Sequence, residues 1–378
     1  MIKILITVLK KLKKMKKIKP YILAATITIL FSAVVFADEK QRLADEEQFF
    51  GHLRAGYITA ENYVGDTASS SAFGGKLSYR STHWNSLTAG ATLYATQKLF
   101  NHDNSDFFSS RGESYAILGE AFIQGDFGHT VIKAGRFEFN SPYADTDDIR
   151  MLPNTFSGAV ISNTDINHTT LYAVYLDQWS GVDSETPEDF TNLNGDAGML
   201  AAGVVYDGIE NVDIQGWYYH GSDLADLVYV EAIYAIGDLV MGAQLGSQTD
   251  KTIDNSGPNG DVYGVMASYA LTEFILSAAY NEVSGTIMNG FGGGPFFTSA
   301  EDHTIGDVLD QKALAVGLEY TGIDKLSVSI LHVAFDKGEN ETDLAALYEF
   351  NSDINIEAIY HHIYDDGNIF LVKFNVSF

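Results

Sequence analysis

Short segments of alternating apolar and polar residues recur along the chain from Phe49 to its end. In the last segment, Phe370, Phe374 and Phe378 have one parity, whereas Lys373 and Asn375 have the other. Because successive side chains of a β-strand point to opposite faces, such a segment predicts a strand with one apolar face. Eighteen segments are predicted to be strands, at residues 51–60, 73–81, 86–96, 115–124, 130–139, 156–163, 169–177, 199–206, 212–221, 226–235, 239–248, 262–271, 274–283, 312–320, 326–335, 343–350, 354–363 and 368–378.

The connections between these segments are alternately short and long. Residues 125–128, 236–238 and 351–353 form tight turns, whereas residues 98–113, 178–198 and 283–311 form long loops. A membrane barrel has this arrangement, with brief periplasmic turns and long outer loops, and a soluble sandwich has no need of it.

Polar residues such as Gln244, Asn281 and Glu357 lie opposite the apolar parity of their strands. A closed sheet of this many strands is too wide for side chains to fill, so its polar face would line water. The sequence therefore predicts an all-β fold, a transmembrane antiparallel β-barrel of about 18 strands. Sixteen strands remain an alternative, because the segments around Phe156 and Leu224 alternate weakly.

The beginning of the chain has the features of an export signal. Eight lysines and no acid lie between Lys3 and Lys19, and an apolar run at residues 21–36 leads to the small residue Ala37. This predicts a signal peptide at residues 1–37 and a barrel domain at residues 38–378, in the outer membrane of a Gram-negative bacterium. Translation from Met15 would give a signal of more ordinary length, and both start sites stay open.

Composition excludes several classes of function. The chain has no cysteine, so disulfides and thiolate chemistry are excluded. Without residues 1–37, 15 basic residues face 50 acidic ones, a net charge of −35. So acidic a chain is not expected to bind nucleic acid.

One long connection differs from the others in its composition. After a strand that begins at Val131, Pro142 and Pro153 enclose a charged segment that also contains apolar residues. Because those apolar residues need packing partners, we expect the segment to fold back onto the barrel wall. An ordinary surface loop is the alternative. The residues predicted to form an inward constriction loop are Tyr143, Asp145, Asp147, Asp148, Arg150 and Pro153.

This region also carries a resemblance to a known family. The sequence Ile132-Lys133-Ala134-Gly135, then Ser141-Pro142, then the run from Asp148 to Phe156 with Gly158, resembles the hallmark of OprD-type outer-membrane porins. The terminal Phe378 resembles the signal by which the barrel assembly machinery recognises outer-membrane barrels. The resemblance implies an 18-stranded monomer whose third long loop narrows the channel, and substrates that are small, often charged solutes. From the residues alone, a monomer and a homotrimer both stay open.

Strand parity places two groups of charges in the lumen. A basic wall is predicted from Arg54, Lys76 and Arg80, with Arg136 in competition with Lys133, which has the opposite parity. An acidic wall is predicted from Glu120, Asp213, Glu231, Glu319, Glu349 and Glu357. Opposed walls would orient charged or zwitterionic solutes, and the net charge favours cations. Alternatively, the arginines pair with loop acids such as Asp148 and hold the loop in place.

No metal site or cofactor is predicted. The acidic loops lack EF-hand spacing, and His361 and His362 point to opposite faces of their strand, so packing at an interface is the better explanation for them.

The sequence predicts a passive porin rather than an enzyme. No nucleophile-elbow motif of the GxSxG kind is present, and the histidines are scattered along the chain. The predicted channel is water-filled and admits small hydrophilic solutes across the outer-membrane lipid. A structural or adhesive barrel without a transport role is the alternative, in which the glycine-rich run at residues 290–297 would form an outer loop tip.

Overall fold

The computed structural model describes residues 47–62, 64–104 and 106–378, and it consists of strands joined by turns and coil. The predicted signal peptide lies outside the described residues. No helix in the described part of the chain is both long and apolar enough to cross a membrane. The strands are β1 (Gln48–Asn62), β2 (Thr67–Arg80), β3 (Leu87–His102), β4 (Tyr115–Phe127), β5 (Thr130–Phe137), β6 (Thr155–Asn163), β7 (Thr169–Ser180), β8 (Thr191–Asn192), β9 (Met199–Ile209), β10 (Val212–Gly221), β11 (Ala225–Ile236), β12 (Leu239–Asp250), β13 (Gly260–Leu271), β14 (Phe274–Gly285), β15 (Lys312–Ile323), β16 (Leu326–Phe335), β17 (Glu341–Glu349), β18 (Ile354–Ile363) and β19 (Gly367–Ser377).

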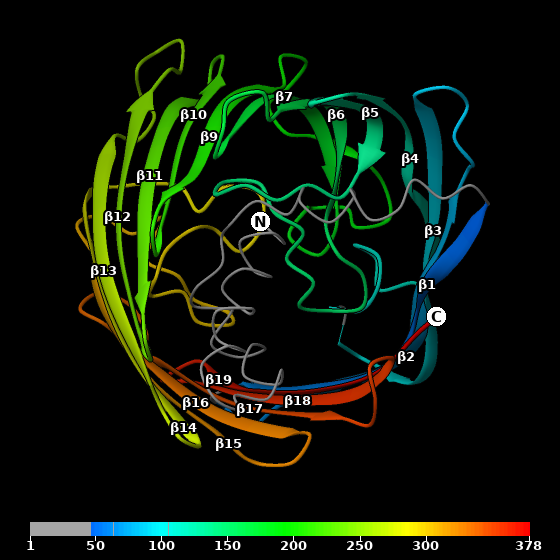
Figure 1. The fold of residues 1–378 in the computed structure, drawn as a ribbon. Helices are drawn as coiled ribbons and strands as arrows, with labels where there is room; N and C mark the ends of the chain where they lie inside the picture. The colour runs from blue at the N-terminus through cyan, green and yellow to red at the C-terminus, as the bar shows by residue number, and fades with distance from the viewer. Residues whose placement is uncertain (1–46, 63, 105) are drawn as a thin grey trace.

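The strands form one closed antiparallel sheet (Figure 1). Each long strand pairs with its neighbours in sequence, and the ring closes where β1 pairs with β19. The two-residue β8 pairs only with the end of β7, and the barrel continues from β7 directly to β9. Eighteen strands therefore make the barrel, as predicted, and the sixteen-strand alternative is wrong.

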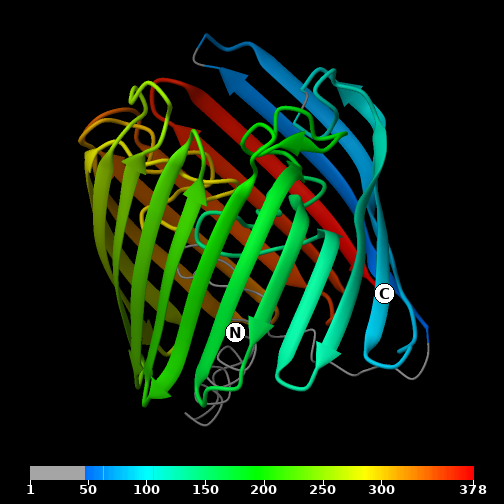
Figure 2. The same cartoon turned by 90° about the horizontal axis from the view of Figure 1, so that it is seen from above.

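The two ends of the barrel differ in the length of their connections (Figure 2). Turns such as residues 128–129, 237–238 and 272–273 join strands at one end, whereas residues 138–154 and 286–311 join strands at the other. The predicted alternation of short and long connections is confirmed.

Side chains alternate between the two faces of each strand. On β12, Leu245 is 61% exposed, whereas the adjacent Gln244 is 1% exposed. On β19, Phe370 and Phe374 are exposed, whereas Leu371 and Lys373 are buried. The outward face is thus the apolar one, as a lipid-facing surface requires.

The inner face is less polar than expected, because two connections lie inside the barrel. We call residues 138–154, between β5 and β6, the first interior loop, and residues 286–311, between β14 and β15, the second interior loop. Both contribute to a hydrophobic cluster with the inner faces of the strands, through Phe139 and Tyr143 from the first and Ile287 and Phe291 from the second. The inner wall is aromatic where these loops pack against it.

Candidate functional site

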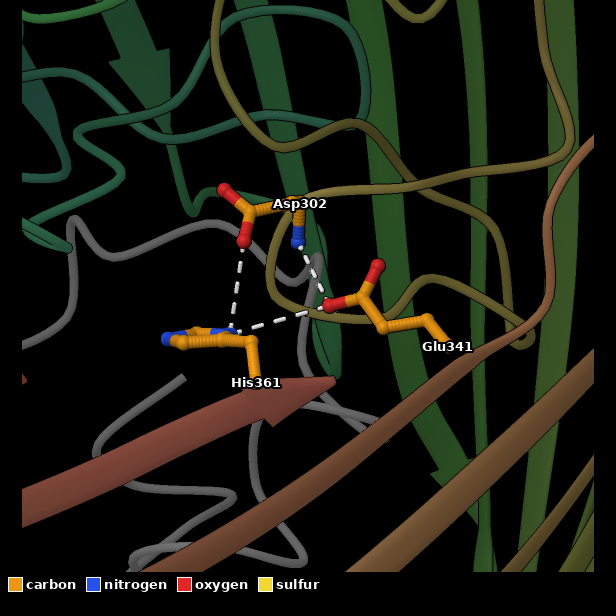
Figure 3. Close-up of side chains that lie close together, drawn as sticks. All are labelled: Asp302, Glu341 and His361. Atoms are coloured by element: carbon orange, nitrogen blue, oxygen red, sulfur yellow. Dashed lines mark hydrogen bonds and ion pairs between the residues drawn. The ribbon is translucent and has the colours of Figure 1, made fainter. Parts of the chain in front are cut away.

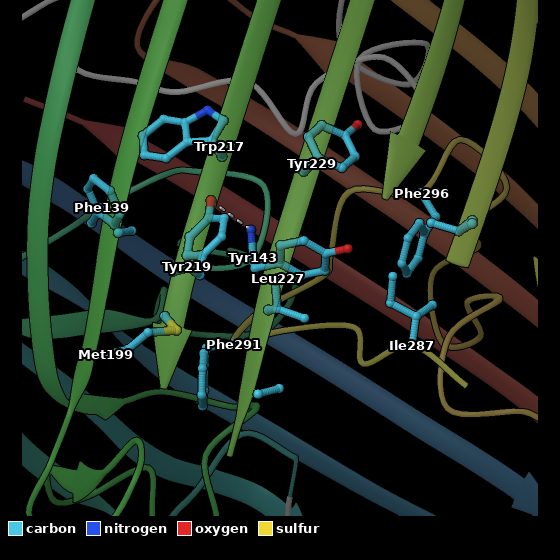
Figure 4. Packing of buried hydrophobic residues seen from close by; sticks show 14 of the residues in the cluster. Phe139, Tyr143, Met199, Trp217, Tyr219, Leu227, Tyr229, Ile287, Phe291 and Phe296 are labelled. Carbon is cyan, nitrogen blue, oxygen red and sulfur yellow. Dashed lines mark hydrogen bonds between the residues drawn. The ribbon is translucent and has the colours of Figure 1, made fainter. Parts of the chain in front are cut away.

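The first interior loop is held at one side of the barrel by Tyr143, which is fully buried. Its ring lies edge-on to Tyr219 of β10 at 5.5 Å and to Tyr229 of β11 at 6.1 Å between ring centroids (Figure 4). Its backbone N–H also donates to the Tyr219 hydroxyl at 3.4 Å. Edge-to-face contacts of this kind add to the free energy gained from burial.

The other end of the loop packs on a different part of the wall. Met151 and Leu152 are buried in a second hydrophobic cluster with Ile58 of β1 and Leu371 of β19. Gly56 of β1 makes room for Met151, since a Cβ added there would lie 2.8 Å from the Met151 sulfur. In an 18-stranded ring, β1 and β10 lie on opposite sides (Figure 1). The loop therefore makes contacts on both sides of the barrel. Pro153, next along the chain, is buried and has no backbone N–H to satisfy.

Arg54 and Asp148 form the most complete ionic contact of the loop with the wall. The guanidinium donates to the two carboxylate oxygens of Asp148 at 2.7 and 2.9 Å, and to the Arg150 carbonyl at 2.6 Å. Burial alone would raise the pKa of Asp148, but the charge and hydrogen bonds of Arg54 outweigh burial and lower that pKa. Arg54 thus holds the loop in place, as the alternative interpretation of the arginines expected.

The side chain of Arg150 contacts two other connections. Its side chain is 7% exposed and lies 3.2 Å from the Asp302 carboxylate in the second interior loop and 3.9 Å from Asp106 in the loop after β3. Three connections far apart in sequence therefore meet at one guanidinium.

Asp145 and Asp147 lie among other acids instead of basic groups. Burial raises the pKa of Asp145 to about 7, although the Gly293 backbone N–H donates to its carboxylate at 3.3 Å. Burial also raises the pKa of Asp147, and the nearby charges of Asp183 and Asp145 raise it further. In the part of the chain that the structure describes, neither acid has a basic ion-pair partner. The site can therefore hold protons or attract cations.

The glycine-rich run at residues 290–297 lies inside the barrel, so the expectation of an outer loop tip is wrong. The Phe291 backbone N–H donates to the Tyr143 carbonyl at 2.9 Å, and its carbonyl accepts from Asp145 at 3.1 Å. Gly290 has a φ of +97°, and a Cβ there would lie 2.6 Å from the Tyr143 carbonyl oxygen. Gly290 therefore allows the backbone of this run to approach the first interior loop closely enough for Phe291 to form these hydrogen bonds.

Two of the four residues predicted for the basic wall, Arg54 and Lys76, are paired with acids. Lys76 pairs with Glu138 at 2.5 Å, and Arg80 lies over the rings of Phe50 and Phe122 at 5.7 and 5.6 Å.

Arg136 does not line the lumen, which corrects its assignment to the basic wall. Its guanidinium lies 4.2 Å from the centroid of Phe190, and it shares the parity of the exposed Ile132, whereas Lys133 is 5% exposed and faces inward. The prediction from parity was wrong because the inner face of β5, which was expected to be polar, carries the buried aromatic residue Phe137.

The predicted acids are distributed over several regions of the inner face. Glu319 and Glu357 line one recess together with Glu301 and Asp343. Glu231 is buried on another part of the wall, where Gln215 donates to it at 2.9 Å. The remaining three also face inward. The buried Thr92 donates to Glu120 at 2.8 Å. Asp213 and Glu349 lie an even number of residues from Gln215 and Asp343, which are buried on the inner faces of the same strands.

The C-terminal Phe378 lies at the seam of the barrel. Its backbone exchanges hydrogen bonds with Gly51 at 3.0 and 3.1 Å, and its ring is 56% exposed on the outer side of β19. The ring is therefore accessible.

Several interior residues were missed by the analysis of the sequence. Lys373 donates to the Ile149 carbonyl at 3.2 Å and pairs with Glu357 at 3.0 Å, and its inward parity on the last strand could have identified it. Asp302 and Asp183 lie on connections, which carry no periodic signal, so sequence parity could not place them. His361 was expected to pack at an interface and instead faces three carboxylates inside the barrel.

Comparison with known structures identifies the architecture. Pseudomonas aeruginosa OccK8 (OprE) superposes with a TM-score of 0.77 at 17% identity, over 88% of this chain and 98% of that one. A BenF-like porin from Pseudomonas fluorescens Pf-5 gives 0.78 at 16% identity, over 89% and 100%. Pseudomonas aeruginosa OpdK, determined with vanillate, gives 0.75 at 16% identity, over 88% and 99%. At these identities the likeness concerns the fold.

Comparison of sequences identifies the family. Among curated proteins there is no significant match. The model of the OprD family of outer membrane porins matches residues 92–333, well over half of the chain and including the first interior loop. The chain therefore belongs to the OprD family of outer membrane porins.

Proposed function

We propose that this protein is a passive outer-membrane channel for small hydrophilic solutes, and that the first interior loop narrows its passage. The observation that carries the proposal is the contact of this loop with both sides of the barrel, through Tyr143 at β10 and Arg54 at β1. A segment fixed at both sides reduces the open cross-section without closing an 18-stranded barrel. No catalytic step is part of the proposal.

We propose a preference for cations among these solutes. Arg54, Lys76 and Lys373 are each paired with a carboxylate of the protein, so their charges are largely compensated. Asp145, whose pKa is about 7, has no such compensation and is negatively charged above that pH. In a narrow passage, uncompensated carboxylates raise the local concentration of cations and lower that of anions.

We propose that the small hydrophilic solutes include charged and zwitterionic organic molecules. OpdK, which has the same fold, was determined with vanillate, a charged organic molecule.

The test is single-channel recording in a planar bilayer with the purified full-length mature chain. We expect open steps, a reversal potential of cation-selective sign in a salt gradient at pH 8, and weaker selectivity for Asp145→Asn at that pH. Asp254→Asn is the matched control, since Asp254 lies outside the barrel on the β12–β13 connection, where Ser256 donates to it at 2.6 Å. Anion-selective steps would contradict the cation preference alone. A correctly folded barrel that never conducts would contradict transport and favour a structural or adhesive role.

We also propose that export uses residues 1–37 as a cleaved signal and that the barrel assembly machinery reads the terminal Phe378. The accessible ring of Phe378 at the seam supports the second proposal. Replacing Phe378 by Ala should reduce the amount of folded barrel in the outer membrane without changing the conductance of the barrels that assemble.

A further inference from the structure

Four potential metal ligands from three segments meet inside the barrel. His361 comes from β18, Glu341 and Asp343 from β17, and Asp302 from the second interior loop. Figure 3 shows the side chains of Asp302, Glu341 and His361 pointing toward one another. The imidazole Nδ1 lies 3.4 Å from Asp302 Oδ2, 3.6 Å from Glu341 Oε1 and 3.4 Å from Asp343 Oδ1. One nitrogen therefore faces three carboxylate oxygens at nearly equal distances.

These distances fit a shared cation better than direct hydrogen bonds. A nitrogen that donates to a carboxylate lies about 2.7–2.9 Å from the oxygen. Ligand atoms bound to one tetrahedral Zn²⁺ at 2.0–2.2 Å lie roughly 3.3 Å from one another. The distances from His361 Nδ1 to the carboxylate oxygens match the second arrangement, and the ligand atoms of Asp302, Glu341 and His361 all lie within 4.8 Å of one another.

The carboxylates are held in this orientation by the second interior loop. The backbone N–H groups of Asp302 and His303 donate to Glu341 at 3.0 and 2.9 Å, and that of Glu301 donates to Asp343 at 3.2 Å. Each of two acids also has its other oxygen engaged. Arg150 contacts Asp302 Oδ1, and His303 contacts Glu341 Oε2. Asp302 Oδ2 faces His361, and so does Glu341 Oε1, which also accepts the Asp302 backbone N–H. Fixed second partners of this kind are typical of metal ligands.

The imidazole of His361 is the strongest indication that this site binds an ion. His361 is fully buried, and neither of its ring nitrogens has a hydrogen-bond partner among the described residues. Asp343 Oδ1, which is directed toward it, has none either. Buried polar atoms are nearly always satisfied, so an unsatisfied pair that faces each other indicates that something binds between them.

We propose that Asp302, Glu341 and His361, with Asp343 beside them, form a binding site for a divalent transition-metal cation of the zinc class. One imidazole nitrogen with carboxylate oxygens is a donor set that such ions accept. Since Asp302 belongs to the second interior loop and the other ligands to the barrel wall, the bound ion fastens that loop to β17 and β18. The site is independent of the proposed transport, because it requires only the folded barrel.

The test is a calorimetric titration with ZnCl₂ of the full mature chain, which is folded and has first been treated with a chelator. We expect one zinc ion per chain, and for His361→Gln an affinity at least about tenfold lower, the smallest effect usual for a change around a metal ligand. His362→Gln is the matched control, because His362 is the next residue, lies on the opposite face and contacts Asn368 at 2.7 Å. Its affinity for zinc should equal that of the wild type.

If His361→Gln does not fold, a second variant and a second metal ion still test the site. Asp302→Asn changes a loop residue, and its folding can be checked by heat-dependent electrophoretic mobility. Co²⁺ should give visible absorption bands of a tetrahedral complex with the wild type and weaker bands with Asp302→Asn. Absence of stoichiometric zinc binding by the wild type, or equal binding by the wild type and the folded site variants, would overturn the proposal. In that case the three carboxylates would surround a protonated His361.

Discussion

The guanidinium of Arg54 donates to both carboxylate oxygens of Asp148, at 2.7 and 2.9 Å. This pair joins the first strand of the barrel to the middle of the first interior loop. Arg54 is 6% exposed and Asp148 is more accessible, with 38% of its side chain exposed, so the contact lies at the boundary between packed interior and water.

Removing this arginine should loosen the loop. Breaking one partner of a buried pair typically costs about 3–5 kcal/mol, and we expect the lower end for Arg54→Ala because Asp148 is partly exposed. The single-channel current should become larger or noisier, since the loop loses its attachment to β1. The measurements are urea unfolding in lipid vesicles and bilayer recording.

Arg136→Ala is the control for Arg54→Ala, because it also removes one arginine but from the outer side of the barrel. Its conductance should equal that of the wild type. Asp148→Asn should have a smaller effect on its own, and little further effect when combined with Arg54→Ala. Additive losses in the double variant would show that the two side chains do not act as a pair.

Cation selectivity should depend on pH through Asp145. Its raised pKa, about 7, means that this carboxyl gains its negative charge as the pH rises from 6 to 8. The ratio of cation to anion permeability should therefore increase over that interval, and Asp145→Asn should reduce the increase. Reversal potentials measured at several pH values test this, and an unchanged pH profile in the variant would refute it.

Stability should change in the opposite direction over a wider interval. Because the pKa of Asp145 is higher in the folded protein than in the unfolded chain, the protonated group favours folding below pH 4. This contribution is lost as the pH rises through 7. The urea midpoint of Asp145→Asn should thus fall less between pH 4 and pH 8 than that of the wild type.

Tyr143 should act through its ring and not through its hydroxyl. The ring is fully buried against Tyr219 and Tyr229, whereas its hydroxyl oxygen has no hydrogen-bond partner in the described structure. We expect Tyr143→Ala to cost about 3–5 kcal/mol and Tyr143→Phe to change the free energy of unfolding by less than about 1 kcal/mol. Equal destabilisation by both would mean that the hydroxyl has a partner, such as a bound water.

Gly290 should tolerate alanine less well than a glycine in an open turn. Alanine at Gly290 would combine a positive φ with a Cβ 2.6 Å from the Tyr143 carbonyl oxygen. Gly237, in the turn between β11 and β12, has a φ of +58° but no atom within 4 Å of an added Cβ. Gly237→Ala should cost about 1–2 kcal/mol, and Gly290→Ala clearly more, as measured by thermal unfolding.

The strands could be predicted from the sequence because lipid imposes a strict alternation on them. The predicted segments at residues 212–221, 326–335 and 354–363 coincide with β10, β16 and β18. Most others end within a few residues of their predicted limits, since turn residues and loops interrupt the alternation.

The interior could be predicted only in part, because it is built from connections. The composition around Tyr143 indicated an inward segment, but nothing periodic marked the second interior loop, whose position depends on contacts with Tyr143 and Asp145. Parity also failed for Arg136, since an inner wall covered by loops is apolar like the outer one. Pairing of Arg54 with Asp148 could be proposed from charge but not distinguished from a free arginine.

The position of Arg54 has a consequence for the order of assembly. Besides Asp148, its Nε donates at 2.7 Å to Asn375, a residue of β19 that is 321 positions later in the chain. The contact that holds the first interior loop therefore depends on both strands at which the barrel closes: Arg54 from β1 binds the loop, and Asn375 from β19 binds Arg54. During folding, contacts so distant in sequence form late. Before the barrel closes, Arg54 lacks its contact with Asn375, so we expect the pore to reach its final width only when the first and last strands pair.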